Sequence, residues 1–336
     1  MAVFPSPSEQ ADGAFSAESL ERLCEDIRMT GYAVVGGLVA PETCALINES
    51  VLEDVATVLA TGQPTAHEKA TASGHLQLGA RRYAPYVQPD LIANPLIESV
   101  VAAVLGQGAW LGFYNGNVNC PRSGYQPLHY DRPFSWTTPE DAAEDGRPWP
   151  PPTTTLSCSI AVTDINAEAG ATESYPGTQN EVAVAQLSSR RLADNPELVE
   201  SWGPPTRMEI PAGGICFRDP RMWHRGVPNL SDRPRPMLAL TYHSPLCRHW
   251  RGLLLRDMSA SDIARCEADA TLRVMDDGTL GDGRLVFHAS AARAFDRASP
   301  TINRNARFVD APVDHLSGAH EVGGARLVEG ARRPTS

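Results

Sequence analysis

Lysine is almost absent from this chain: Lys69 is the only lysine among 29 basic residues, and 40 acidic residues outnumber them. The formal net charge is −11. A protein that binds nucleic acid or an anionic membrane needs a basic face to neutralise the phosphates. The charge balance therefore argues against both partners. It leaves room for a local basic pocket that binds a small anion.

Three further patterns are missing from this sequence: closely spaced cysteine pairs, the charge and hydropathy pattern of a signal peptide, and a long apolar run. The seven cysteines are widely spaced, odd in number and never arranged as C-x-x-C, which is typical of reduced thiols in a cytoplasmic protein. Residues 1–15 contain no basic stretch followed by an apolar one, so we expect no signal peptide. No run of about 18 apolar residues occurs, so we expect no membrane helix.

The chain does have the composition of a globular protein, with 42% hydrophobic and 21% charged residues among 336. Helical patterns come first, after which strand patterns separated by turn signals take over. The expected helices are 16–29, 41–59 and 94–105, and the expected strands are 32–38, 109–119, 125–131, 153–163, 170–175, 208–210, 215–218 and 237–243. This order predicts an α+β protein with a double-sheet barrel as its core.

One domain is expected to contain most of the chain. We place it at residues 16–316, with insertions at about 135–152, 182–202 and 249–295. Residues 1–15, rich in proline and serine, are predicted to be a loose N-terminus, and residues 317–336 a flexible tail.

The most informative motif is His129-x-Asp131. Positions i and i+2 of a strand point to the same face, so both side chains can bind one metal ion. His224 can supply a third ligand, and two histidines with one carboxylate form the ligand set of a non-haem Fe(II) oxygenase. An H-x-[DE] motif arises about once by chance in such a chain, so the motif gains weight only from the complete set. Asp219 is a rival carboxylate, or a turn residue before Pro220.

A basic residue follows the second histidine at a sequence spacing that can bring it back beside the metal site. Arg235 lies eleven residues beyond His224 (235 − 224), across a loop rich in turn residues. A guanidinium there can grip the distal carboxylate of a co-substrate whose other end chelates the metal. Arg233 is the rival for this role, and an ordinary surface arginine is the alternative. His243, at the end of the same strand, faces either the cavity or the protein core.

Five segments of the sequence, spread over roughly residues 31–243, together resemble the phytanoyl-CoA dioxygenase family. The family consists of Fe(II)/2-oxoglutarate oxygenases built on a double-stranded β-helix, or jelly-roll, core. Where the family usually has Pro-Gly-Ser-His, this chain has Thr178 and Gln179, and neither is an expected ligand. The segments are Gln126-x-x-His129-x-Asp131, Asn166-x-Glu168-x-Gly170-Ala171-Thr172, Pro176-Gly177-Thr178, Trp223-His224-x-Gly226 and Arg235.

The resemblance implies a reaction and its metal centre. His129, Asp131 and His224 are implied as the catalytic Fe(II) ligands, with 2-oxoglutarate and O2 as co-substrates. Hydroxylation of a C–H bond is the default outcome, while desaturation, epoxidation and rearrangement stay open. Related halogenases have a small residue in place of the carboxylate, so Asp131 predicts that no halogenation occurs.

The resemblance also implies which residues hold 2-oxoglutarate. Arg235 is the partner of the C5 carboxylate, and Thr172 donates a hydroxyl to the same group. Gln126 matches a position that helps to hold the co-substrate in similar enzymes, and Asn115 or Asn117 on the preceding strand has a similar place.

The substrate is expected to be a small, specialised metabolite, because the chain has several insertions and an acidic balance. Arg81, Arg82, Tyr83 and Tyr86 lie where similar enzymes contact substrate, and a surface loop is the alternative. Two other functions stay open. One is a cupin-like metal isomerase or hydrolase that does not need Arg235, and the other is a barrel used only for binding.

Overall fold

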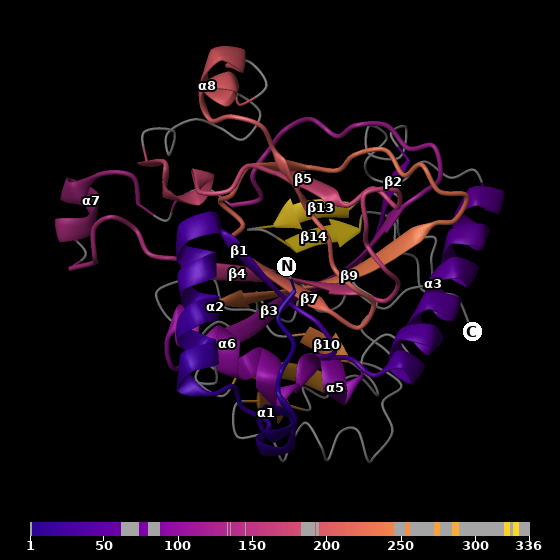
Figure 1. Ribbon diagram of the computed structural model, residues 1–336, viewed down its shortest axis with the longest axis horizontal. Helices are drawn as coiled ribbons and strands as arrows, with labels where there is room; N and C mark the ends of the chain where they lie inside the picture. Colours follow the sequence, from indigo (N-terminus) through magenta and orange to yellow (C-terminus); the bar gives the residue numbers. More distant parts are fainter. Residues whose placement is uncertain are drawn as a thin grey trace.

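Two antiparallel sheets form the centre of the computed structural model (Figure 1). The larger has the order β1-β7-β4-β9-β3-β2, and the smaller β6-β5-β8. The large sheet consists of β1 (Tyr32–Val35), β7 (Ile215–Arg218), β4 (Thr155–Ala161), β9 (Arg235–His243), β3 (Trp110–Asn119) and β2 (His75–Gly79). The structure describes residues 2–61, 74–79, 88–132, 134, 136–144, 146–182, 192, 195–244, 253–255, 272–275, 284–288, 319–322 and 325–328.

Alternation along the strands gives the large sheet one apolar and one polar face. In β4, Leu156, Cys158 and Ile160 belong to the main hydrophobic core, while Ser157 and Ser159 point the other way. The apolar face packs against helices α2 (Ala17–Thr30), α3 (Pro41–Thr61) and α6 (Pro95–Leu105). The polar face is therefore left for the interior between the sheets.

Two of the three helices, α2 and α6, have caps that the sequence provides. The Ser16 side chain accepts a hydrogen bond from the backbone of Ser19, and Gly31 ends α2 in the left-handed conformation. Asn94 caps α6 through the backbone N–H groups of Leu96 and Ile97. The predicted helices 16–29, 41–59 and 94–105 are thereby confirmed, and so is the α+β class.

The small sheet consists of β5 (Thr172–Ser174), β6 (Thr206–Met208) and β8 (His224–Arg225). It faces the polar side of the large sheet, since residues of both sheets line one cavity. The strand expected at 208–210 begins earlier, and Ile210 makes only an isolated bridge with Ile165. The short β8 is paired with β5 through Ser174 and His224.

The N-terminal segment differs from the predicted loose segment at 1–15. Val3 pairs with Val35 at the edge of the large sheet, and residues Pro7–Asp12 form helix α1. Ser6 and Glu9 make a reciprocal capping box that closes the start of this helix. The proline and serine content suggested a flexible end, whereas here these residues begin a helix.

Two strand predictions are also corrected. The segment 125–131 is not a strand, because its ladder is reduced to the single bridge between His129 and His224. Residues His75–Gly79, for which no strand was predicted, form β2, which pairs with β3. The pairing partner of β2 is some 40 residues away along the chain (119 − 75 = 44), so local composition could not reveal it.

The insertions contain short helices. Helices α7 (Pro139–Glu144) and α8 (Pro196–Ser201) stand away from the sheets (Figure 1), in the segments expected at 135–152 and 182–202. The other short helical elements are α5 (Pro89–Ile92) and η1 (Thr178–Asn180). No described helix has the length and apolar character to cross a membrane.

The C-terminal part adds strands where a mixed insertion and a tail were expected. β10 (Leu253–Leu255), β12 (Arg284–His288) and β11 (Leu272–Met275) form a three-stranded sheet in that order. β13 (Ala319–Val322) and β14 (Ala325–Val328) form a hairpin within the predicted tail at 317–336. The domain limits at 16 and 316 stay a prediction.

Candidate active site

The two histidines of the predicted triad hold each other through their backbones. The N–H of His129 donates to the carbonyl of His224 over 3.0 Å, and the N–H of His224 donates back over 2.8 Å. His224 is fixed from its other side by β5. The irregular segment that carries His129 is thus anchored to the small sheet at His129 itself.

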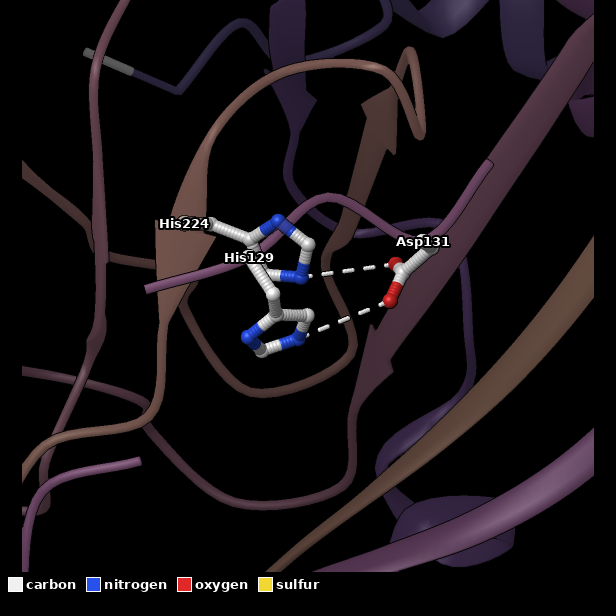
Figure 2. Close-up of side chains that lie close together, drawn as sticks. All are labelled: His129, Asp131 and His224. Carbon is white, nitrogen blue, oxygen red and sulfur yellow. Dashed lines mark ion pairs between the residues drawn. The ribbon is translucent and has the colours of Figure 1, made fainter. Parts of the chain in front are cut away.

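Three side chains converge at this point (Figure 2). Nε2 of His129 lies 3.6 Å from Oδ1 of Asp131, and Nε2 of His224 lies 3.4 Å from Oδ2. One nitrogen or oxygen from each of the three lies within 4.8 Å of the others. This spacing lets three donors contact one ion placed between them.

The remaining ring nitrogens are occupied by carbonyl groups. Nδ1 of His129 lies 2.8 Å from the carbonyl oxygen of Pro127, and Nδ1 of His224 lies 2.9 Å from that of Met222. A carbonyl accepts hydrogen bonds, so each Nδ1 carries the proton and each Nε2 presents a lone pair. Backbone acceptors of this kind orient histidine ligands in metal sites.

The charges of the triad suit a divalent ion. Burial, followed by the nearby Arg218, lowers the pKa of His224 to about 4, so its ring is neutral at neutral pH. Asp131 lines the cavity, and 41% of its side chain is exposed there. Its removal from bulk water would raise its pKa, but His224, Arg218 and His129 together hold that pKa well below the usual value. Two imidazoles with free Nε2 lone pairs and an ionised carboxylate are a donor set that fits iron(II).

A cavity of about 150 Å³ extends from the triad between the two sheets. It is larger than a single water needs and suits a small organic acid. Of the predicted co-substrate residues, Gln126, Thr172, Asn117 and Arg235 line it. Asn115 is in register with Ala239 in β3 and β9, but its side chain lies outside the described part of the structure.

Arg235 is a buried cation that lines the same cavity as the triad. It is 5% exposed, and it donates through Nη2 to the carbonyl oxygen of Gly170 over 3.2 Å and through Nε to that of Ala169 over 3.4 Å. Burial lowers its pKa to about 10, which leaves it charged at neutral pH. No carboxylate among the described residues lies within 4.0 Å of it. A buried charge without a counter-ion is costly, so the cavity beside Arg235 favours an anion.

The rival arginine lies elsewhere. The side chain of Arg233 is 89% exposed, and its closest acidic group is Asp232, with 3.9 Å between Nε and Oδ1. Arg233 is therefore on the surface, and of the two arginines it is Arg235 that the structure brings into the cavity.

Gln126 ties the two ligand-bearing segments together. Its N–H donates to the carbonyl of Gly226 over 2.9 Å, and its side-chain Oε1 accepts from the N–H of Gly226 over 2.9 Å. Gly226 is two residues beyond His224, and Gln126 three residues before His129. The reciprocal bonds therefore fix the spacing between the segments, a role that the sequence did not suggest.

Asp219, the alternative carboxylate ligand, has a structural role in a buried ion pair. Asp219 is 1% exposed and forms an ion pair with Arg221, whose Nη2 lies 2.6 Å from Oδ2. Its Oδ1 also accepts from the backbone N–H of Arg221, which is the turn geometry proposed as the alternative. His243 lies beside Thr155, with 3.2 Å between Nδ1 and Oγ1, and is not among the described residues that line the cavity.

Several lining residues were missed by the sequence analysis. Arg218 carried a signal: a charged residue at the end of the apolar strand Ile215–Arg218 must find a partner inside the protein. The others had no distinguishing pattern, and they are His75, Asn119, Ser159, Met208 and Met237. Arg81, Arg82, Tyr83 and Tyr86 lie outside the described residues.

Comparison with known proteins identifies relatives of this chain. Residues 27–237 match the family model described as phytanoyl-CoA dioxygenase (PhyH). The chain is similar to the solved structure of the non-haem α-ketoglutarate-dependent carbocyclase SnoK from nogalamycin biosynthesis, with 18% identity, a TM-score of 0.52, and coverage of 71% of this chain and 87% of SnoK.

Two further solved structures are similar at a TM-score of 0.49. The α-ketoglutarate-dependent epimerase SnoN from nogalamycin biosynthesis is 19% identical, with 68% of this chain and 82% of SnoN covered. EvdMO1 is 18% identical, with 67% of this chain covered, and the match spans half of EvdMO1. The SnoK likeness and the family match agree with the expected double-stranded β-helix fold.

Proposed function

Because this chain belongs to the phytanoyl-CoA dioxygenase family of non-haem iron, 2-oxoglutarate-dependent oxygenases, we propose that it oxidises a C–H bond of a small, specialised metabolite. The observation that carries the proposal is one cavity lined both by the His-Asp-His triad and by Arg235, a buried arginine with no carboxylate partner among the described residues. The family assignment favours this function over the cupin-like isomerase or hydrolase.

In this proposal His129, Asp131 and His224 hold iron(II), and Arg235 binds the C5 carboxylate of 2-oxoglutarate. When bound, iron and 2-oxoglutarate would supply the oxidising power: 2-oxoglutarate is converted to succinate and CO2, with one oxygen atom of O2 going to succinate and the other to the substrate C–H bond. Each Nδ1 keeps its proton and donates it to the carbonyl of Pro127 or Met222, so each Nε2 is left with a lone pair for the metal.

The other lining residues orient the co-substrate and exclude water. Thr172 lines the cavity from β5 and donates its hydroxyl to the C5 carboxylate beside Arg235. Asn117 lines it from β3, and Gln126 keeps the two ligand segments in register.

The nature of the substrate follows from the insertions and the charge. The helical segments α7 and α8 lie outside the two-sheet core, where they can shape a specific entrance. The acidic balance of −11 disfavours nucleic acid as the substrate. Hydroxylation is the default reaction, and the carboxylate of Asp131 leaves no vacancy for a halide.

The test is an anaerobic titration of the protein with Fe(II) and 2-oxoglutarate. Direct chelation is expected to give a visible charge-transfer band, and O2 should then release succinate even without substrate. Arg235→Ala should weaken co-substrate binding strongly, by about 2–5 kcal/mol, because it removes the buried partner of a carboxylate. The matched control is Arg233→Ala, two residues before Arg235 but exposed, which should behave as wild type.

The outcome separates the candidate functions. If iron-loaded protein gives no charge-transfer band and no succinate, the oxygenase proposal is refuted. The isomerase, hydrolase and binding functions are then the remaining candidates. A band that persists unchanged in Arg235→Ala would keep the oxygenase but place the co-substrate elsewhere.

A further inference from the structure

Arg218 is a buried cation that the proposed function leaves without a role. It ends β7, where its backbone is in register with Tyr32 of β1 on one side and Ser157 of β4 on the other. Its side chain is only 7% exposed and lines the cavity beside the triad. Burying a charge is costly unless it is paired, so its partners should indicate why it is there.

Its partners are two members of the triad. Nη2 donates to Oδ2 of Asp131 over 2.5 Å, and Nη1 lies 3.2 Å from Nδ1 of His224. That Nδ1 also faces the carbonyl of Met222, and it cannot donate to the carbonyl and accept from the arginine at once. In the tautomer that frees Nε2 for a metal, Nδ1 donates to Met222. The hydrogen bond that Arg218 then keeps is the one to Asp131.

We propose that Arg218 is a positioning residue that restricts Asp131 to binding the metal through one oxygen. The inference rests on the proposed function, because it requires Asp131 to be a ligand. Carboxylates bind metals through one oxygen or through both. Binding through both uses one more of the positions opposite the triad, and the oxygenase reaction needs those positions for the keto-acid and for O2.

The structure gives Arg218 the means to enforce this choice. The large sheet fixes its backbone on both sides, so the guanidinium approaches Asp131 from a fixed direction. Asp131 itself lies in the irregular segment after His129, where its own backbone does not determine which oxygen faces the metal. A donor placed on Oδ2 removes that freedom, and the other oxygen remains for the ion.

Arg221 provides a matched comparison within the same stretch of chain. It is also 7% exposed and also binds a carboxylate, since its Nε and Nη2 donate to Asp219. Its further partners are the carbonyl of Pro151 and the hydroxyl of Thr153, and none of these belongs to the triad. Loss of Arg221 therefore removes a buried ion pair without touching the metal centre.

The experiment measures the open position directly. Wild type, Arg218→Met and Arg221→Met are loaded with Fe(II) and 2-oxoglutarate without O2, and then titrated with nitric oxide, an O2 analogue detected by electron paramagnetic resonance. Arg218→Met should keep iron and the charge-transfer band but bind nitric oxide about tenfold more weakly or worse, because a charged hydrogen bond is lost. Arg221→Met should keep the nitric oxide affinity of wild type, and Arg218→Lys should recover most of it.

Each alternative result has a meaning. Equal nitric oxide affinity in wild type and Arg218→Met would overturn the inference, and so would an equal loss in Arg221→Met. Loss of iron from Arg218→Met would overturn it in favour of a simpler role, keeping Asp131 in the site at all. If Arg218→Met does not fold, iron-loaded Arg218→Lys that fails to recover the affinity contradicts the inference. Wild type that binds neither iron nor 2-oxoglutarate refutes the proposed function itself.

Discussion

In each histidine of the triad, a backbone carbonyl determines which ring nitrogen carries the proton. The carbonyls of Pro127 and Met222 face the Nδ1 atoms, and both carbonyls lie two residues before the histidine that they orient. The tautomer is therefore set by local chain geometry and needs no distant partner. A histidine outside this arrangement, such as His243 beside Thr155, is not oriented toward the same point.

At the residue scale we first predict that His224→Ala loses iron. Removing one of three donors should weaken Fe(II) binding by at least about 100-fold, more than the loss of an outer partner. His243→Ala is the control, because His243 is also a buried histidine but lies in β9, outside the triad. Equilibrium dialysis with Fe(II) under anaerobic conditions measures both, and equal affinities would refute His224 as a ligand.

A second prediction concerns the hydroxyl of Thr172. Thr172→Val keeps the shape of the side chain but removes a donor to the co-substrate carboxylate, so 2-oxoglutarate should bind about tenfold more weakly. Thr206→Val on the neighbouring strand is the control, since Thr206 bonds to Ser174 and does not line the cavity. The charge-transfer band, titrated with 2-oxoglutarate, gives both dissociation constants. An unchanged constant for Thr172→Val would exclude this donor.

At the element scale, the turn before β5 and the loop before β9 are built against each other. Gly170 has a φ of +75°, and its carbonyl accepts from Arg235. Asn119, at the end of β3, donates to the carbonyl of Val227 over 2.9 Å. Asn229 is fully buried and donates to the carbonyls of Asn119 and Arg233. These contacts fix the turn at Gly170 and the loop before β9, and they therefore position the guanidinium of Arg235 without an ion pair to it.

The third prediction tests this close approach with Gly170→Ala. A Cβ at Gly170 would collide with Nδ2 of Asn119 and lie 3.0 Å from the carbonyl oxygens of Val227 and Pro228. The positive φ alone should cost about 1–3 kcal/mol of unfolding free energy, and the collisions should add to it. Gly106→Ala is the matched control, with a φ of +86° and nothing within 4 Å. Urea unfolding should show the larger loss for Gly170→Ala, and equal losses would contradict the packing argument.

The elements differ in how far the sequence could predict them. Helices α2 and α6 were predictable because Ser16, Asn94 and Gly31 are local signals that act within a few residues. β2 was not, because it becomes a strand only by pairing with the distant β3. The segment around His129 contains the right residues, but a single bridge to His224 replaces the strand that alternation predicted.

At the scale of the whole molecule, the site exists because the two sheets face each other. His224 and Thr172 come from the small sheet, and Arg218 and Arg235 from the large one. The sequence suggested the triad and Arg235 through a motif and a spacing. It could not predict Arg218 as a partner of Asp131, which is 87 residues away along the chain (218 − 131) and meets it only after the sheets have closed.

The fourth prediction uses this dependence of the site on the whole fold. A ligand that binds only the folded state, at 100 times its dissociation constant, adds about 2.7 kcal/mol to the stability. With an unfolding entropy of about 2.1 cal/mol/K per residue over 336 residues, that should raise the melting temperature by about 4 °C. Anaerobic thermal unfolding with and without Fe(II) and 2-oxoglutarate measures the shift. His224→Ala should show none, and a full shift in that variant would mean that the ion binds elsewhere.

The paired backbones of His129 and His224 have one more consequence. Bringing these residues together closes a loop of 95 residues (224 − 129), and the entropy of that closure is lost during folding, when the two N–H···O=C bonds form. In small zinc domains the ion itself has to close the chain, so a chelator unfolds them. Here a chelator should remove the metal ion and leave the protein folded. The ion could then be added back and removed again repeatedly, without an unfolding step.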